Sequence, residues 1–333
     1  MKEGYLKIAI VGCGAISESY YLPALRRHND VELTLVDTDE QRLEMVGNAF
    51  GTKKRIKDYH EILGEVDGAI VATPNSSHHR ISIDFLRESS HVLCEKPLAV
   101  AATDAREMIA QAEQSGVTLS ANNIRRLYPS FQAVKKLISE GSLGEVRSIV
   151  YLDGEDFSWP TVTGFFFDRQ SSKGVLLDQG AHALDAICWW IGCKPDLISC
   201  RTDSFGGPEA AVAVRFKRGS TTGDVRLSWL ARLRNRYSIE CENGRILGGT
   251  RDWGKLTVGL GSEKPRIMEV DPTTESWRVL REKMVDNFLS VVAGKAEPLV
   301  PAREVVESLE LIDESYAAAE RFDMPWCDNV ECI

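Results

Sequence analysis

The sequence predicts an α/β protein in which a parallel sheet with helices on both faces is followed by a second domain with a mostly antiparallel sheet. Three observations lead to this prediction. The first third alternates short apolar strands with amphipathic helices. After about residue 123 the pattern changes to longer alternating runs separated by turn signals. The length of 333 residues suits two domains, which we place at 1–122 and 123–333.

The predicted first domain is a regular series of strands and helices. We expect strands at 7–12, 31–37, 68–73, 91–96 and 117–122, and helices at 16–28, 39–50, 76–90 and 103–116. Pro23 predicts a kink in the first helix. A serine opens the helix at 76–90, and Thr103 and Gly116 are the expected cap and stop of the last one.

The predicted second domain begins with one long helix at 128–144. Strand-like runs follow at 145–156, 196–205, 209–219 and 220–250, and helical patterns at 276–294 and 302–321 close the chain. Between them, the stretch KGVLLDQGAHALD at 173–185 has the pattern of an amphipathic helix.

Composition restricts the classes of function. The net charge of −9 argues against nucleic acid as a partner. No signal peptide is recognisable, and no apolar run reaches the length of a membrane span. The eight cysteines are scattered without a C-x-x-C pair, so we expect reduced thiols in a cytoplasmic protein and no metal site. Cys327 and Cys332 lie in a terminal stretch that we interpret as a loose end with spare thiols.

The stretch GCGAIS at 12–17 has the features of a dinucleotide-binding turn. Gly12 permits a tight turn, and Gly14 lets the backbone approach a pyrophosphate at the start of a helix. Ser17 replaces the third glycine of the usual pattern. Asp37, at the end of the second predicted strand, is placed to bind both ribose hydroxyls, which favours NAD over NADP. The alternative is a structural glycine turn with a surface aspartate.

Two further motifs follow the third and fourth predicted strands, at the sheet edge where ligands bind. ATPNSSHH at 72–79 is by itself typical of a tight turn that caps the next helix. In CEKPLA at 94–99, Lys96 precedes a proline that holds it out of helical geometry, so it can project into a cleft. A solvent-facing salt bridge between Glu95 and Lys96 is an equally good interpretation of this motif.

The stretch at 173–185 carries Asp178, His182 and Asp185, which share one face if it is helical. They form a candidate acid/base group, because imidazole titrates near neutrality and a carboxylate can orient it. The alternative is a buried histidine satisfied by its neighbours. A metal site is weakly supported, since no further His or Cys lies at a suitable spacing.

Taken together and in this order, the motifs resemble those of the Gfo/Idh/MocA oxidoreductases, which include glucose-fructose oxidoreductase and inositol dehydrogenase. RRLYP at 125–129 resembles that family's Arg-Arg-Phe-x-Pro segment. The resemblance covers most of the chain. It implies an N-terminal Rossmann domain that binds a nicotinamide cofactor, and a C-terminal α/β domain with a large open sheet.

By position, the resemblance implies that Lys96 is the catalytic lysine, Asp178 the substrate-orienting aspartate and His182 the acid/base histidine. The expected cofactor contacts are Gly12, Gly14, Ala15, Ile16, Asp37, Thr73, Pro74, Asn75, His78, Glu95, Lys96 and Pro97. The expected substrate contacts are Lys96, Arg126, Trp159, Asp178 and His182. The chain departs from the family pattern at Lys173, which replaces a glycine, at Leu127, which replaces an aromatic residue, and at Ser17.

We therefore expect an NAD-dependent oxidoreductase that transfers a hydride to or from a hydroxyl or ketone carbon of a sugar, inositol or sugar derivative. The alternatives are an NAD-using glycosidase or lyase that acts through a transient ketone, and a non-catalytic sugar or nucleotide sensor. Trp159 is the expected aromatic lining, and Phe165, Phe166 and Phe167 are expected to be mostly core.

One further pattern bears on assembly. Arg226, Arg232, Arg234 and Arg236 alternate with apolar residues, so we expect them on one strand face. That face attracts an anionic substrate or packs against another subunit, and the family's use of its sheet predicts a homo-oligomer, a dimer or tetramer.

Overall fold

The computed structural model describes residues 5–160, 164–168, 172–261, 264–270 and 277–323. The chain folds into two compact units. The first draws on residues 1–124, 160–165 and 276–306, and the second on residues 125–159, 166–275 and 307–333. The first unit thus includes a late segment of the chain, well beyond residue 122.

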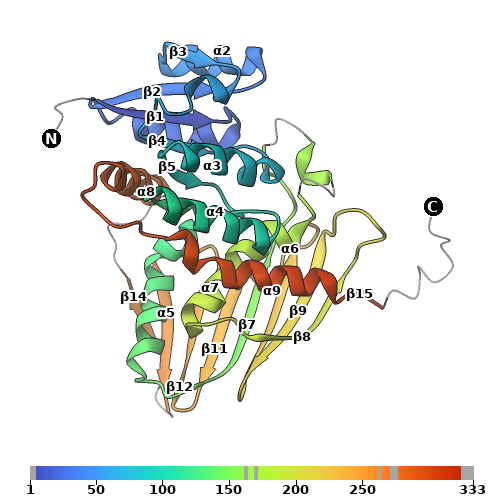
Figure 1. Cartoon of the computed structure of the whole chain (residues 1–333). Coiled ribbons are helices and arrows are strands. Elements are labelled where there is room, and N and C mark those ends of the chain that lie inside the picture. The colour runs from blue at the N-terminus through green and yellow to red at the C-terminus, as the bar shows by residue number, and fades with distance from the viewer. Residues whose placement is uncertain (1–4, 161–163, 169–171, 262–263, 271–276, 324–333) are drawn as a thin grey trace. The chain divides into compact units, whose positions relative to one another are not determined.

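The first unit contains a six-stranded sheet in the order β3-β2-β1-β4-β5-β6, and all of its strand pairs are parallel (Figure 1). Its strands are β1 (Leu6–Val11), β2 (Val31–Val36), β3 (Lys54–Ile56), β4 (Gly68–Val71), β5 (His91–Cys94) and β6 (Leu119–Ala121). Every residue of β4 is buried, as expected for a strand covered on both faces. The strand order reverses between β1 and β4, and the carboxyl edge at such a point is where ligands bind.

The helices of this unit are placed by local signals and by packing. They are η1 (Ser17–Tyr21), α1 (Leu22–Leu25), α2 (Glu40–Phe50), η2 (Tyr59–Ile62), η3 (Asn75–Ser77), α3 (His78–Arg87), α4 (Ala102–Ser115), α8 (Trp277–Val292) and η7 (Ala302–Glu304). The Asp39 side chain caps α2 by accepting from the backbone N–H groups of Gln41 and Arg42, and Gly51 ends it at φ 70°. α4 begins at Ala102, so the predicted threonine cap is wrong: Thr103 lies inside the first turn.

The expected kink at Pro23 takes the form of a π-helical turn, η1, directly before α1. Proline has no N–H to donate to the carbonyl of Ser19, its partner in a regular α-helix. The guanidinium of Arg281, on α8, donates to that carbonyl instead at 2.6 Å. A residue 262 positions later in the chain thereby supplies the donor that Pro23 lacks.

The second unit contains a nine-stranded sheet in the order β14-β13-β12-β11-β7-β10-β9-β8-β15. The strands are β7 (Val146–Gly154), β8 (Asp196–Thr202), β9 (Ala211–Arg218), β10 (Thr221–Ser228), β11 (Arg236–Cys241), β12 (Gly244–Gly249), β13 (Lys255–Leu260), β14 (Arg266–Glu269) and β15 (Ala319–Arg321). Only β7 with β10 and β8 with β15 pair in parallel. The predicted mostly antiparallel sheet is therefore confirmed.

Helices cover one face of this sheet. η4 (Ile124–Leu127) leads into α5 (Pro129–Glu140), and η5 (Phe165–Phe167), α6 (Val175–Asp178), α7 (Gly180–Ile191) and α9 (Val306–Ala317) follow. α5, α7 and α9 lie on the same side of the sheet (Figure 1). Between helices and sheet, Phe131, Trp190, Tyr151 and Tyr237 pack ring against ring as the buried core.

The strand-like run at 220–250 is divided among β10, β11 and β12 in the structure. β10 ends at Ser228 and β11 begins at Arg236, so Arg232 and Arg234 lie in the connection and the single arginine face is wrong. Arg226 and Arg236 both pair with Leu152 of β7, from its two sides, and so do share a face. None of the described helices has the length and apolar character that a membrane span requires.

Candidate active site

The turn after β1 is shaped by Gly12 and Gly14 in different ways. Gly12 has φ 99°, and a Cβ there would lie 2.4 Å from the backbone oxygen of Ala72, so only glycine fits without strain. Above Gly14 a Cβ would meet nothing within 4 Å, which leaves open space where a phosphate would approach the backbone. Ser17, the departure from the usual pattern, is fully buried and donates to the Gly12 carbonyl at 2.5 Å. This hydrogen bond from the Ser17 hydroxyl therefore stabilises the turn.

Asp37 directly follows β2, and two backbone N–H groups hold its carboxylate. Cys13 donates to Oδ2 at 2.6 Å and Asp39 donates to Oδ1 at 2.9 Å. Arg42 closes the same loop by donating to the Cys13 carbonyl at 2.6 Å. Each carboxylate oxygen retains a further lone pair, so Asp37 can still accept from ribose hydroxyls.

The loop after β4 is braced by a buried histidine. His78 is fully buried, with Nδ1 2.8 Å from the Pro97 carbonyl and Nε2 2.8 Å from the Thr73 carbonyl. Burial lowers the pKa of His78, although the two carbonyls favour its protonated form. Thr73 also accepts from the hydroxyl of Ser77, and Asn75 is buried in the next turn. His78 thus ties the loop carrying Thr73, Pro74 and Asn75 to the one carrying Lys96 and Pro97.

Lys96 follows the end of β5, next to a carboxylate that is held inside the first unit. Glu95 is 8 % exposed and its Oε1 accepts from the Tyr21 hydroxyl and the Asn122 amide, both at 2.7 Å. Its Oε2 accepts from the backbone N–H of Lys96 at 3.1 Å. Burial, and then the charge of Glu95, raise the pKa of Tyr21 well above its usual range. Glu95 therefore anchors the backbone of Lys96, and the solvent-facing salt bridge does not describe it.

In the second unit, Asp178 and His182 occupy two short helices rather than one. α6 ends at Asp178 and α7 begins at Gly180, with Gln179 between them in helical geometry. The backbone N–H groups of His182 and Ala183 both donate to the Gln179 carbonyl, so the two helices stay nearly continuous. Asp178 is buried and His182 half-buried. The backbone therefore stays helical from Asp178 to His182.

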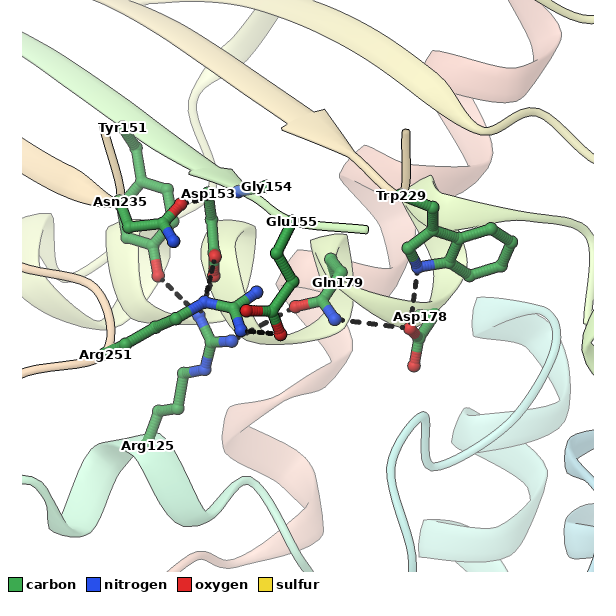
Figure 2. Close-up of polar contacts among 10 residues, drawn as sticks. All are labelled: Arg125, Tyr151, Asp153, Gly154, Glu155, Asp178, Gln179, Trp229, Asn235 and Arg251. Carbon is green, nitrogen blue, oxygen red and sulfur yellow. Dashed lines mark hydrogen bonds and ion pairs between the residues drawn. The ribbon is translucent and has the colours of Figure 1, made fainter. Parts of the chain in front are cut away.

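Two N–H donors converge on one oxygen of Asp178 (Figure 2). The indole Nε1 of Trp229 lies 3.3 Å from Oδ2, and the amide Nε2 of Gln179 lies 3.4 Å from the same atom. Trp229 is itself packed by Phe157 and Phe166, at ring-centroid distances of 5.3 and 6.2 Å. Asp178 therefore has an aromatic group on one side and a polar group on the other.

A buried polar cluster begins behind Gln179 (Figure 2). Arg125 donates to the side-chain amide oxygen of Gln179 at 3.1 Å, to the Tyr151 hydroxyl at 2.8 Å and to Asp153 at 2.6 Å. The other oxygen of Asp153 accepts from Arg251 at 2.8 Å. Burial acts to raise the pKa of Asp153, but the two guanidinium groups outweigh it and lower that pKa. Asp153 is thus held as an anion between two arginines.

Asp185, whose role the sequence left open, pairs with Arg126. The Arg126 Nε and Nη2 donate to the two oxygens of Asp185 at 2.9 and 2.7 Å, and both side chains are almost fully buried. The guanidinium also lies 5.5 Å from the Trp189 ring. The structure thus gives Arg126 a place in a bidentate ion pair, and its expected contact with substrate stays a prediction.

The conformation of Lys173 explains the glycine that it replaces. Lys173 has φ 60°, in the left-handed region that favours glycine. Its ammonium lies 3.8 Å from Asp313 and 5.2 Å from the centre of the Tyr316 ring. At the following Gly174, a Cβ would lie 2.3 Å from the buried carboxylate of Glu209. One left-handed position thus accepts a lysine, whereas the next still requires glycine.

The aromatic residues before α6 differ from expectation. Phe167 is 60 % exposed and Phe165 and Phe166 are half-buried, so this run is not mostly core. Phe166 and Phe167 both pack against Phe157, each at a ring-centroid distance of 5.3 Å. Trp159 is 43 % exposed, and its role as substrate lining stays a prediction.

Sequence reasoning missed several of these contacts. The alternation that predicts the arginine face places Trp229 on the opposite, apolar face, although the N–H of a buried indole requires an acceptor and so indicates a polar neighbour. The position of Arg125 next to Arg126 in the RRLYP segment was a signal that could have identified it. Asp153 had no such signal, because its partners Arg125 and Arg251 are distant in the chain. Gln179 is adjacent to its partner Asp178, but its other partner, Arg125, is 54 residues away.

The described residues fit a dinucleotide: a glycine turn with open space over Gly14, and a carboxylate, Asp37, at the end of the neighbouring strand. Among the residues that the structure describes, no group of three or more His, Cys, Asp or Glu is arranged to hold a metal ion. All six cysteines described are free thiols, and Cys327 and Cys332 lie outside the described residues.

Comparison with known proteins decides the family. Residues 6–123 match the family model described as "Oxidoreductase family, NAD-binding Rossmann fold", and residues 131–247 match the Gfo/Idh/MocA C-terminal domain. The chain belongs to the Gfo/Idh/MocA family of oxidoreductases. This membership confirms the predicted family, the two-part α/β fold, the oxidoreductase class and the nicotinamide cofactor.

Members of the Gfo/Idh/MocA family with assigned activities resemble this chain over nearly its whole length. D-apiose dehydrogenase of Paraburkholderia graminis is 33% identical over 332 residues, which cover 94% of this chain and 87% of that protein. 1,5-anhydro-D-fructose reductase of Ensifer adhaerens is 29% identical over 318 residues, covering 90% and 92%. The crystal structure of aldose-aldose oxidoreductase from Caulobacter crescentus, complexed with glycerol, superposes with a TM-score of 0.82 at 23% identity, covering 94% and 97% of the two chains. It shows that the fold is shared.

Proposed function

We propose that this chain is an NAD-dependent dehydrogenase, or a ketone reductase in reverse, for a sugar, inositol or sugar derivative. Lys96, Asp178 and His182 are its chemical groups. The observation that carries the proposal is the buried Asp178, held by two N–H donors one turn before His182. Relatives named for D-apiose and 1,5-anhydro-D-fructose support a carbohydrate substrate.

The proposed roles follow from the chemistry of an alcohol–ketone interconversion. Bound NAD accepts or supplies the hydride. His182 takes the hydroxyl proton during oxidation and returns it during reduction. Lys96 donates a hydrogen bond to the reacting oxygen and stabilises its developing negative charge. Asp178 accepts from a substrate hydroxyl and orients the ring. Glu95 and His78 keep the Lys96 backbone in place through the contacts described above.

Asp37 supports NAD as the preferred form of the cofactor. Its carboxylate, held by the N–H groups of Cys13 and Asp39, would repel a 2′-phosphate. Arg42, on α2, is already engaged by Glu18 and by the Cys13 carbonyl.

The test is a panel of sugars, inositols and nucleotide sugars, followed by NADH absorbance in both directions. At least one compound should give turnover that His182→Ala lowers by roughly 10²- to 10⁴-fold, the usual contribution of an acid/base group. NADH affinity, measured separately by fluorescence titration, should stay within about twofold of the original in this variant. A parallel loss of turnover and NADH affinity would instead mean that His182 is structural.

The same panel separates the alternative functions. A glycosidase or lyase would release a fragment from a glycoside without net change in NADH absorbance. A sensor would bind NADH and sugar with no turnover of any compound. Either result would replace the proposed dehydrogenase.

We also infer that the chain forms a homo-oligomer, a dimer or tetramer, through the face of the nine-stranded sheet opposite the helices, and that it works in the cytoplasm. The shared face of Arg226 and Arg236 and the exposed Val150 support a polar-rimmed contact there. The free thiols support a reducing compartment. Light scattering coupled to size exclusion should give a mass of two or four chains, and a monomer would contradict the inference.

A further inference from the structure

The amide of Gln179 has only one orientation that its partners allow. Arg125, which lies 3.1 Å from the amide oxygen, has donors and no acceptor, so that oxygen must face it. The NH₂ group therefore faces the carboxylate of Asp178, which requires a donor. The Gln179 amide thus accepts from Arg125 through its oxygen and donates to Asp178 through its nitrogen. A flip of the amide would break both hydrogen bonds.

The side chain of Arg125 is held in place by partners other than Gln179. Its guanidinium is held by the Tyr151 hydroxyl and by Asp153, whose side chain is fully buried. Arg251 holds the second oxygen of Asp153, and its far end pairs with Glu155, which is half-exposed. A continuous polar chain therefore runs from Glu155 at the surface through the two arginines to Gln179 (Figure 2).

This chain and Trp229 approach Asp178 from different directions (Figure 2). Both donors contact Oδ2, at 3.3 and 3.4 Å. Two donors on one oxygen favour the carboxylate orientation that keeps this oxygen within reach of both. Trp229 gains support from Phe157 and Phe166, so each donor is fixed by its own surroundings.

We propose that Gln179 is a positioning residue for the reaction: backed by Arg125 and Asp153, it sets the orientation in which Asp178 meets substrate. The inference rests on the proposed role of Asp178. It makes Gln179 more than a link between α6 and α7, since its side chain, and not only its backbone, carries the effect. Because the indole N–H of Trp229 donates to Asp178, the spectroscopic signal of Trp229 should respond to the position of that carboxylate.

Two substitutions distinguish the hydrogen bond of the Gln179 amide oxygen to Arg125 from that of its nitrogen to Asp178. Gln179→Met keeps the length of the side chain and removes both hydrogen bonds. Gln179→Glu keeps an acceptor for Arg125 but places a carboxylate against Asp178. We expect Gln179→Met to lower kcat by roughly 10- to 100-fold, the range for a small misplacement of a reacting group, with KM for NADH unchanged. We expect Gln179→Glu to lower kcat and to move the acidic limb of the kcat/KM–pH profile upward, because two adjacent carboxylates cannot both ionise readily.

A second measurement does not depend on activity. With 5-fluorotryptophan at the seven tryptophans, the ¹⁹F signal of Trp229 is assigned from its loss in Trp229→Phe. Gln179→Met should shift this signal and leave the others in place, which also shows that the fold is intact. Gln111→Met is the matched control: Gln111 is another half-buried helical glutamine, with one hydrogen bond to Ser115, and its loss should change neither kcat nor the Trp229 signal.

The outcomes are distinct. An unshifted Trp229 signal in Gln179→Met, or wild-type kcat and pH profile in Gln179→Glu, would overturn the inference. If the unmodified protein turns over no compound of the panel, the proposed function fails, and the Trp229 signal alone decides whether Gln179 positions Asp178.

Discussion

The buried carboxylate of Glu209 should make the stability of the second unit depend on pH. Glu209 is 3 % exposed, and its Oε1 accepts from the Leu176 backbone N–H at 2.8 Å and from the Tyr316 hydroxyl at 2.9 Å. Burial raises its pKa from 4.5 to about 7, with the charge of Asp203 adding to the rise and the hydrogen bonds opposing it. The acid is therefore protonated in the folded protein at pH values where the unfolded chain has already ionised.

The magnitude follows from the difference between the two pKa values. Because the folded pKa is the higher one, the contribution of Glu209 to stability is complete below pH 4.5 and is lost as the pH rises through about 7. The shift of about 2.5 units corresponds to roughly 3 kcal/mol, of which roughly 2 to 3 kcal/mol is lost between pH 5 and 8. The neighbouring phenol and thiol do not titrate in this window, since burial raises the pKa of Tyr316 well above its usual range and that of Cys200 to about 12.

The perturbation is Glu209→Gln, which keeps a carbonyl for Leu176 and Tyr316 but does not titrate. Urea unfolding followed by tryptophan fluorescence suits this test, because Trp159, Trp189, Trp190, Trp229 and Trp253 all belong to the second unit. The difference in unfolding free energy between variant and wild type should move by roughly 2 to 3 kcal/mol in favour of the variant from pH 5 to pH 8.

The exposed Glu320→Gln is the control for this experiment and should show no such trend. If the difference between Glu209→Gln and wild type is the same at both pH values, the raised pKa of Glu209 is refuted.

Three further predictions concern other parts of the molecule. Asp185→Ala should destabilise the second unit by about 3–5 kcal/mol, because it leaves the buried guanidinium of Arg126 without its partner; a urea-midpoint change no larger than that of a surface control would contradict this. Gly12→Ala should destabilise the first unit and abolish NADH binding, because the added Cβ would clash with the Ala72 backbone. Gly14→Ala should keep the wild-type urea midpoint and lose only NADH affinity. Equal urea midpoints for the two variants would show that the close contact at Gly12 does not restrict the residue there. Asp37→Ala should lower the ratio of NAD to NADP kcat/KM by roughly 10- to 100-fold, and an unchanged ratio would remove Asp37 from the ribose site.

Local patterns predicted much of the first unit and the helical character of the stretch that carries the candidate acid/base residues. β1 and β2 begin and end within a residue of the predicted strands, because apolar β-branched runs bounded by turn residues are a strong local signal. The backbone stays helical across the break between the two helices, because Gln179 has helical geometry. The short edge strands β3 and β15 were missed, since three residues carry little periodicity.

The sequence by itself determined which chemical groups this protein has and on which elements they lie: the glycine turn, Asp37 at a strand end, Lys96 after a strand, and Asp178 and His182 on one helical turn. Only the tertiary structure decided their partners. Asp178 meets Trp229 from 51 residues away, and Arg125 meets Gln179 from 54. Such contacts are absent from local periodicity, because the packing of distant elements decides which buried donor finds which acceptor. For the same reason the sequence alone does not explain Lys173 at a glycine position. The tertiary structure explains it through a left-handed backbone and contacts with Asp313 and Tyr316.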